Sequence, residues 1–282
     1  FRHRNSGAFF SSSLIGSLGG LIGLGGAEFR LPVLVGAFGV PTLEAVILNK
    51  AISLVVVSSA MLFRSHAIQF STLWSASAVV CNLLAGSLIG AWWAAGYMQR
   101  LSARWLNRII LLLLLTLAVL MLSEAFFPLR TVGQPLLDNP WLLRLAGVVA
   151  GLGIGAVAAV LGVAGGELLI PTGVLLFGLD IKLAGSVSLA VSLPTMIVGF
   201  LRYRQASAFT VLSQERGLLW AMVVGSIAGS ALGAQLLGIV PAHALMIGLG
   251  GILLLSPSKA FTHAHHSTRG LLTPLTATHS QA

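Results

Sequence analysis

The sequence predicts an all-α polytopic membrane protein of about eight transmembrane segments, built from two homologous repeats of four segments each. Three observations predict this class. The 282-residue chain is 56% hydrophobic and only 8% charged, whereas an ordinary soluble domain has about 25% charged residues. Apolar runs of about 20 residues, enough to cross a hydrocarbon core, fill most of the chain. The second half of the chain also repeats the first half. A soluble enzyme, a disulfide-rich secreted module and a disordered protein are therefore excluded.

The apolar runs between polar residues define the expected segments in order. They are residues 9–38, 43–63, 73–97, 105–127, 142–177, 183–201, 218–237 and 244–255. The first and fifth runs are too long for one straight crossing. Each is interrupted by a glycine cluster that a glutamate follows, so we expect a helix, a break and a shorter second helix in both.

The two halves align without a gap when the sequence is shifted by 139 residues. The shift superposes glycine, glutamate, proline and serine, which chance apolar similarity does not keep in register over about 70 residues. The matched pairs include Gly23 with Gly162, Gly26 with Gly165, Glu28 with Glu167, Pro32 with Pro171 and Ser53 with Ser192. The expected organisation is a first repeat at 1–127, a linker at 128–141, a second repeat at 142–256 and a polar tail at 257–282. Such duplication is typical of secondary transporters, whose substrate sites lie at the repeat interface.

The net charge of +9 comes from 16 Lys and Arg residues against 7 Asp and Glu residues. Because these cations lie near the ends of apolar runs, they indicate membrane topology rather than a nucleic-acid partner. If all eight segments cross, ten basic residues share the N-terminal side and four share the other, which predicts that both termini are cytoplasmic. The arginines within 100–108 lie on the minority side. Four crossings per half make the repeats parallel, whereas a broken segment that enters and returns makes them inverted, and the sequence leaves both open.

The glycine clusters are candidate anion-binding elements. The start of a half-helix exposes unpaired N–H groups and the positive end of the helix dipole, which suit an oxyanion. The candidate substrate-binding residues there are Gly25, Gly26, Ala27, Gly165 and Gly166. The alternative is close helix packing by small residues.

Glu28 and Glu167 lie within or beside apolar segments, where a carboxylate costs roughly 2.5 to 3.5 kcal/mol to insert. One interpretation is that they take up and release a proton during transport. The other is that each caps the first N–H groups of the helix that follows, and one side chain could do both. Arg30 is a candidate partner for Glu28, but its counterpart Leu169 cannot pair with Glu167.

The segment after each broken run supplies further polar groups at helical spacing. Asn49, Lys50 and Ser53 in the first half, and Ser188 and Ser192 in the second, are candidate substrate-binding donors. The alternative is that Lys50 extends to the membrane interface and the serines bond to their own backbone. The small residues around Gly86 and Gly225 are expected to be helix-packing positions.

No motif indicates an enzyme. The lone Cys81 forms no metal-ligand cluster, and the usual hydrolase and nucleotide-binding patterns are missing from the sequence. We therefore expect no catalytic residues, no metal and no cofactor.

The doubled motif resembles the sulfite exporter TauE/SafE family, also called TSUP. The resemblance rests on the stretches from Gly23 to Pro32 and from Gly162 to Pro171, and on basic turns at Arg64 and at Arg202 to Arg204. It covers about residues 7–255. It implies a bacterial or archaeal inner-membrane carrier for sulfite, sulfoacetate or a related organosulfonate, driven by a proton or another coupling ion. Export is the leading hypothesis. Import of a related anion, or a non-transporting membrane subunit that anchors a sulfur-metabolism enzyme, are the alternatives.

Overall fold

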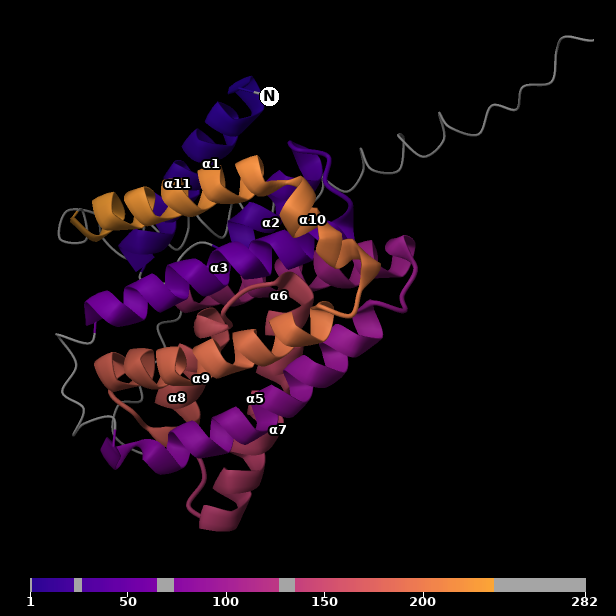
Figure 1. Cartoon of the computed structure of the whole chain (residues 1–282). Coiled ribbons are helices and arrows are strands. Elements are labelled where there is room, and N and C mark those ends of the chain that lie inside the picture. Colours follow the sequence, from indigo (N-terminus) through magenta and orange to yellow (C-terminus); the bar gives the residue numbers. More distant parts are fainter. Residues whose placement is uncertain (1, 23–26, 65–73, 127–134, 236–282) are drawn as a thin grey trace, which may run out of the picture.

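The computed structural model describes residues 2–22, 27–64, 74–126 and 135–235, and every regular element in these ranges is a helix (Figure 1). The first repeat contains α1 (Arg2–Ile22), α2 (Ala27–Gly36), α3 (Thr42–Arg64), α5 (Ser77–Met98) and α6 (Ala103–Phe126). The second contains α7 (Pro140–Leu161), α8 (Gly166–Phe177), α9 (Ile181–Tyr203), η1 (Ser207–Thr210), α10 (Val211–Gln214) and α11 (Arg216–Gln235). The all-helical class is thus confirmed for the described residues. The expected segment at 244–255 and the tail at 257–282 lie outside them.

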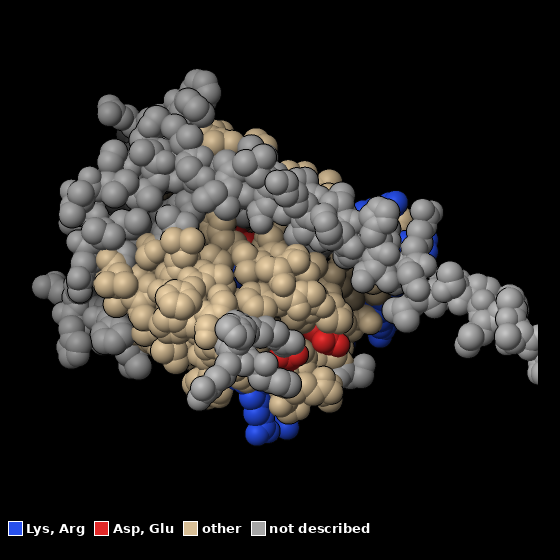
Figure 2. Space-filling model, turned by 90° about the horizontal axis from the view of Figure 1, so that it is seen from above, with Lys and Arg blue, Asp and Glu red and all other residues tan. Residues whose placement is uncertain are grey.

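Four of the described helices are long and apolar enough to cross a membrane, namely α3 over Thr42–Ser59, all of α5 and α7, and α9 over Leu183–Tyr203. Their outer surfaces carry large apolar side chains, such as Trp93, which is 79% exposed, and Trp141, which is 76% exposed. In Figure 2, uncharged residues cover most of the described surface, and Lys and Arg side chains project at its margins. An apolar exterior of this extent fits a lipid environment.

The polar residues before α7 explain where the second repeat begins. The side chain of Asn139 accepts a hydrogen bond of 3.0 Å from the backbone N–H of Trp141, and Pro140 occupies the first helical position. Both are favoured at a helix N-terminus. The helix therefore begins at Pro140, two residues before the expected start of the second repeat at 142.

The helices of the two halves begin at equivalent positions. The starts of α2, α3 and α5 are residues 27, 42 and 77, and those of α8, α9 and α11 are residues 166, 181 and 216. Each of the three pairs differs by 139, the shift that aligns the sequence with itself.

Two helix pairs pack with their backbones almost in contact. A Cβ atom added at Gly86 of α5 would lie 2.0 Å from the carbonyl oxygen of Val148 in α7. At the equivalent place, a Cβ atom at Gly225 of α11 would lie 2.5 Å from the carbonyl oxygen of Phe9 in α1. The small residues therefore act as helix-packing positions, and each half contributes one helix to each pair.

Helices α3 and α9, which are equivalent in the two halves, run in opposite directions. Lys50, near the start of α3, lies against Gly199, near the end of α9, where an added Cβ atom would be 2.9 Å from Lys50 Cε. Glu44, at the start of α3, interacts electrostatically with Glu215, which follows α10. Antiparallel equivalent helices are what an inverted arrangement of the two halves predicts.

Each broken segment enters the bundle and returns to the end where it began. We call the end where α1, α3 and α11 begin and α9 ends the first end, because Gly217 of α11 lies against Asn5 of α1. The chain leaves α2 at this end to start α3. At the second end, Leu136, just before α7, donates from its backbone N–H to the carbonyl of Leu176, near the end of α8, at 3.1 Å. In the described residues the two broken segments therefore form hairpins, α1–α2 and α7–α8, that enter from opposite ends, and the eight crossings stay a prediction.

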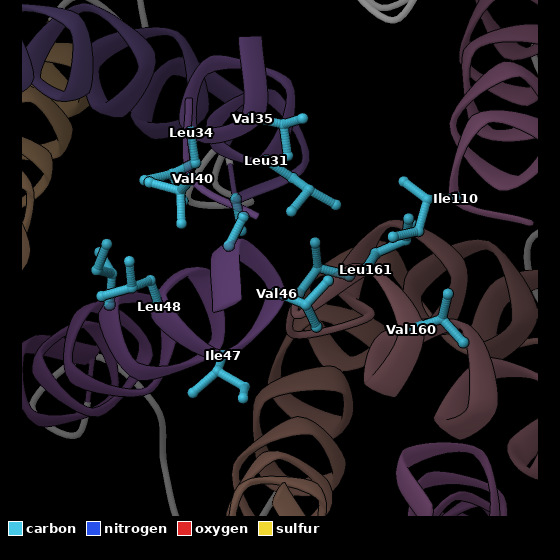
Figure 3. Packing of buried hydrophobic residues seen from close by; sticks show 14 of the residues in the cluster. Leu31, Leu34, Val35, Val40, Val46, Ile47, Leu48, Ile110, Val160 and Leu161 are labelled. Carbon is cyan, nitrogen blue, oxygen red and sulfur yellow. The ribbon is translucent and has the colours of Figure 1, made fainter. Parts of the chain in front are cut away.

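Apolar packing holds the first hairpin in the interior. Leu31 and Leu34 of α2 are fully buried in one cluster with Val46 of α3 and Leu161 of α7. Figure 3 shows Val46 beside Leu161, where α3 meets the end of α7. Close van der Waals packing of such side chains holds the helices of a membrane bundle together, so this cluster fixes where the hairpin tips lie.

Candidate functional site

The break in the second hairpin falls at the glycine cluster. Helix α7 ends at Leu161, and Gly162 follows in the left-handed conformation with φ of 69°, its N–H bonded to the carbonyl of Ala158. Gly165, with φ of 79°, directly precedes α8. These conformations suit glycine because they strain residues that carry a Cβ atom. In the first hairpin α1 ends at Ile22 and α2 begins at Ala27, and the expected binding residues Gly25 and Gly26 lie outside the described residues.

The two glutamates meet. Glu28 lies in the first turn of α2 and Glu167 in the first turn of α8, and their carboxyl groups are joined by a side-chain hydrogen bond. A hydrogen bond between two carboxyl groups needs a proton on one of them. The contact between the carboxyl groups fits the expected proton role, whereas the expected capping role stays a prediction.

Arg30 is the cation beside this pair. Its side chain is fully buried, and Nη2 donates a hydrogen bond of 3.2 Å to Ser53 Oγ of α3. The expected pairing with Glu28 is replaced by this contact, since residues two apart on a helix do not face each other. Glu28 and Arg30 still attract each other electrostatically. The equivalent Leu169 is instead buried in an apolar cluster with Val187 and Val191 of α9.

Asn49 joins the two hairpin tips. Its Nδ2 atom donates to the carbonyl of Ala27, at the start of α2, at 2.9 Å and to the carbonyl of Leu161, at the end of α7, at 3.0 Å. Both N–H groups of the amide are thereby used. Asn49 therefore links the two tips, its expected role in substrate binding stays a prediction, and Oδ1 is buried without a partner in the described part of the chain.

Lys50 faces a different part of the structure from Asn49. Its side chain is fully buried, and Nζ donates to the carbonyl of Ala158 at 3.1 Å. A cation is favourable at the C-terminus of a helix, because the helix dipole places partial negative charge on the last carbonyl groups. Lys50 therefore does not extend to the membrane interface but binds the end of α7.

Tyr203, which the sequence analysis did not single out, completes this arrangement. Its buried hydroxyl donates to the carbonyl of Ala159 at 3.1 Å. Together with Lys50 and Asn49 it supplies side-chain donors to three of the last four carbonyls of α7. No local pattern marks Tyr203, because its partner lies 44 residues away.

The expected serines lie on the helices that pack against the hairpins. Ser53 accepts from Arg30, whereas Ser188 and Ser192 are buried one turn apart on α9. Ser192 Oγ has no hydrogen-bond partner among the described residues. Gly166 and Ala27, at the helix starts, are also buried.

Unpartnered polar atoms gather in this region. Within the described residues, seven buried side-chain nitrogen or oxygen atoms have no hydrogen-bond partner. Five of them are Glu28 Oε2, Arg30 Nε, Arg30 Nη1, Asn49 Oδ1 and Ser192 Oγ. Buried polar groups are nearly always satisfied in folded proteins, so such a group of exceptions indicates a place for a ligand. A buried guanidinium with free N–H groups suits an anion, and the neighbouring carboxyl pair suits a proton. In the same described ranges, no group of three or more His, Cys, Asp or Glu residues is arranged to hold a metal ion.

Comparison with known proteins agrees with the resemblance noted in the sequence. The family model described as Sulfite exporter TauE/SafE matches residues 2–121, from α1 into α6. The match includes Glu28 and Arg30 of the first hairpin and Ser53 of the neighbouring helix α3. No curated protein and no solved structure matches the chain.

Proposed function

Since residues 2–121 carry the signature of the sulfite exporter TauE/SafE family, we propose that this chain is a secondary transporter of a small sulfur-containing anion such as sulfite or an organosulfonate. One observation supports the proposal most directly. The buried Glu28 and the half-buried Glu167, which belong to opposite hairpins, share a hydrogen bond beside a buried arginine with free N–H groups. The proposed cargo sites are thus an anion position at the helix starts and a proton position at the carboxyl pair.

The inverted arrangement suits this activity. Hairpins that enter from opposite ends present the same site to opposite sides when one half moves against the other. Because Glu28 and Glu167 belong to different halves, such a movement changes the contact between their carboxyl groups. The proton position is therefore coupled to the movement that carries the anion.

The arrangement of arginines supports a cytoplasmic first end. Gln99 at the end of α5 donates to the carbonyl of Arg202 at 3.0 Å, and Thr42 at the start of α3 is hydrogen-bonded to Asn107 of α6. The arginines within 100–108, which formed the minority in the eight-crossing arrangement, therefore lie at the first end with Arg202, Arg204 and Arg216. Arg144 lies at the second end. By the positive-inside rule we place the first end, and with it the N-terminus, in the cytoplasm of a bacterial or archaeal cell.

Flux measurements on proteoliposomes test the proposal. Purified full-length protein is reconstituted, and uptake of sulfite, sulfoacetate, sulfate and thiosulfate is followed with and without a pH gradient. We expect a saturable flux of one sulfur anion that follows the pH gradient, in an export or import direction that the two gradient polarities distinguish. The variant with both Glu28→Gln and Glu167→Gln should lose this flux although it folds, because an amide cannot exchange a proton.

Glu44→Gln is the matched control, because Glu44 lies at the first end outside the carboxyl pair and its variant should retain flux. A flux that ignores the pH gradient and survives the double substitution would remove the proton role. Folded wild-type protein without any flux would favour the membrane-subunit alternative.

A further inference from the structure

We propose that Arg30 is the anion-binding cation of this carrier, and that a monovalent anion occupies it only when the Glu28–Glu167 pair has taken up a second proton. This inference rests on the proposed function and deepens it, because it names the charge of the substrate and the way in which proton and anion are coupled.

Arg30 has hydrogen-bond donors that suit an anion. Its guanidinium is fully buried, yet one contact, from Nη2 to Ser53 Oγ at 3.2 Å, is its hydrogen bond to the described residues. Nε and Nη1 are buried without a partner in those residues. A guanidinium presents its donors in a planar fork that matches two oxygens of a carboxylate, phosphate or similar group, and a sulfonate group offers the same geometry.

The other buried cation is already in use. Lys50 Nζ donates to the carbonyl of Ala158 and lies against Gly199 of α9. The second half offers no equivalent of Arg30, since Leu169 lies among apolar side chains at that position. The site therefore has one free guanidinium, on the side of α2.

Charge balance links this guanidinium to the carboxyl pair. The charged group that acts on Glu28 besides Glu167 is Arg30, whereas Lys50 of α3 and Tyr203 of α9 face the end of α7. With one shared proton the pair carries one negative charge, which balances Arg30. An anion added to this state leaves one uncompensated charge in a buried site, and that is strongly unfavourable.

A second proton removes that obstacle. The pair is then neutral, Arg30 is uncompensated, and one monovalent anion restores balance. The empty site with one proton and the loaded site with two protons and an anion are both neutral, whereas the half-loaded states carry a net charge. A buried site disfavours charged states, so the anion and the proton move together in a ratio of one to one. Under an inward proton gradient this coupling drives uptake, so the inference favours import over the export expected from the sequence.

Binding measurements test the inference without requiring transport. Methanesulfonate, which is monovalent, and sulfite are titrated into purified full-length protein by calorimetry in buffers of different ionisation enthalpy, with the proton exchange of sulfite itself subtracted. We expect one proton to be taken up for each anion bound. With both Glu28→Gln and Glu167→Gln, binding should persist without proton uptake, because the amide pair imitates the neutral carboxyl pair.

Arg30→Leu installs the residue that the second half has at this position. It should lower affinity at least thirtyfold, which corresponds to about 2 kcal/mol, and Arg30→Lys should restore part of the loss. Arg144→Leu is the control, since Arg144 is exposed, lies 5.4 Å from the ring centre of Trp141 at the second end, and should bind as the wild type does.

The outcomes distinguish a failure of this inference from a failure of the proposed carrier function. Anion binding without proton uptake, or unchanged binding by Arg30→Leu, overturns this inference and leaves the proposed carrier standing. Folded wild-type protein that binds neither anion overturns both. If Arg30→Leu does not fold, the number of protons taken up by the wild type and the affinity of Arg30→Lys decide the question.

Discussion

Gly162→Ala tests whether the end of α7 is held as closely to α3 as the structure indicates. Gly162 has φ of 69°, and a Cβ atom there would lie 2.6 Å from the carbonyl oxygen of Val46, against 3.4 Å or more for an ordinary contact. Because both sides of this contact are backbone, no side-chain rotation relieves it. The left-handed conformation costs about 1–2 kcal/mol for alanine. About 0.4–1 kcal/mol of this cost is offset, because alanine lowers the conformational entropy of the unfolded chain. The overpacking adds about 1–3 kcal/mol, so the free energy of unfolding should fall by about 2–4 kcal/mol.

Gly39→Ala is the matched control. Gly39 also has a positive φ, of 63°, but no atom lies within 4 Å of an added Cβ. It should lose only the conformational contribution, about 1 kcal/mol. Thermal unfolding of the two purified variants in detergent should then differ by roughly 2–12 °C. Equal midpoints would refute the close approach of α3 to α7, and with it the contacts of Asn49 and Lys50 at the hairpin tips.

Two further substitutions test the packing and the buried lysine. Gly90→Ala places a Cβ atom 2.0 Å from the carbonyl oxygen of Leu152 and should lower the free energy of unfolding by about 2–3 kcal/mol. The control is Gly153→Ala, which has no atom within 4 Å of the added Cβ and should leave stability unchanged or raise it by up to about 1 kcal/mol. Equal melting midpoints of the two variants would contradict this prediction. Lys50→Met removes a buried charge while the carbonyl of Ala158 keeps its backbone donors, so stability should hold or rise by up to about 2 kcal/mol. A loss above about 1 kcal/mol in the same melts would show that the ammonium stabilises the fold.

Some features of the site could be predicted because they depend on neighbours in the chain. A carboxylate in an apolar run is energetically costly wherever that run folds. Glu28 and Glu167 could therefore be identified from their positions in apolar runs of the sequence. Their position at helix starts follows from the glycines that precede them. Arg30 carried the same signal, a lone charge in an apolar segment, but its proximity to Glu28 suggested a pair that helical geometry does not allow.

Other features depend on contacts between distant segments. Asn49, Lys50 and Ser53 looked like one polar face, yet Lys50 lies about 100° around the helix from Asn49 and reaches another helix. Tyr203 gains its partner only when α9 packs beside the end of α7. No local pattern reports such contacts.

The sequence by itself determined that this chain is helical, apolar and duplicated, because hydropathy and an exact spacing of 139 residues are properties of order along the chain. It also determined which residues are chemically out of place in an apolar interior. Only the tertiary structure decided that the described broken segments return as hairpins, that α3 and α9 run in opposite directions, and that the two glutamates share one position beside Arg30. The direction in which a segment leaves a glycine break depends on what packs against it, and that is fixed by contacts between residues far apart in the sequence.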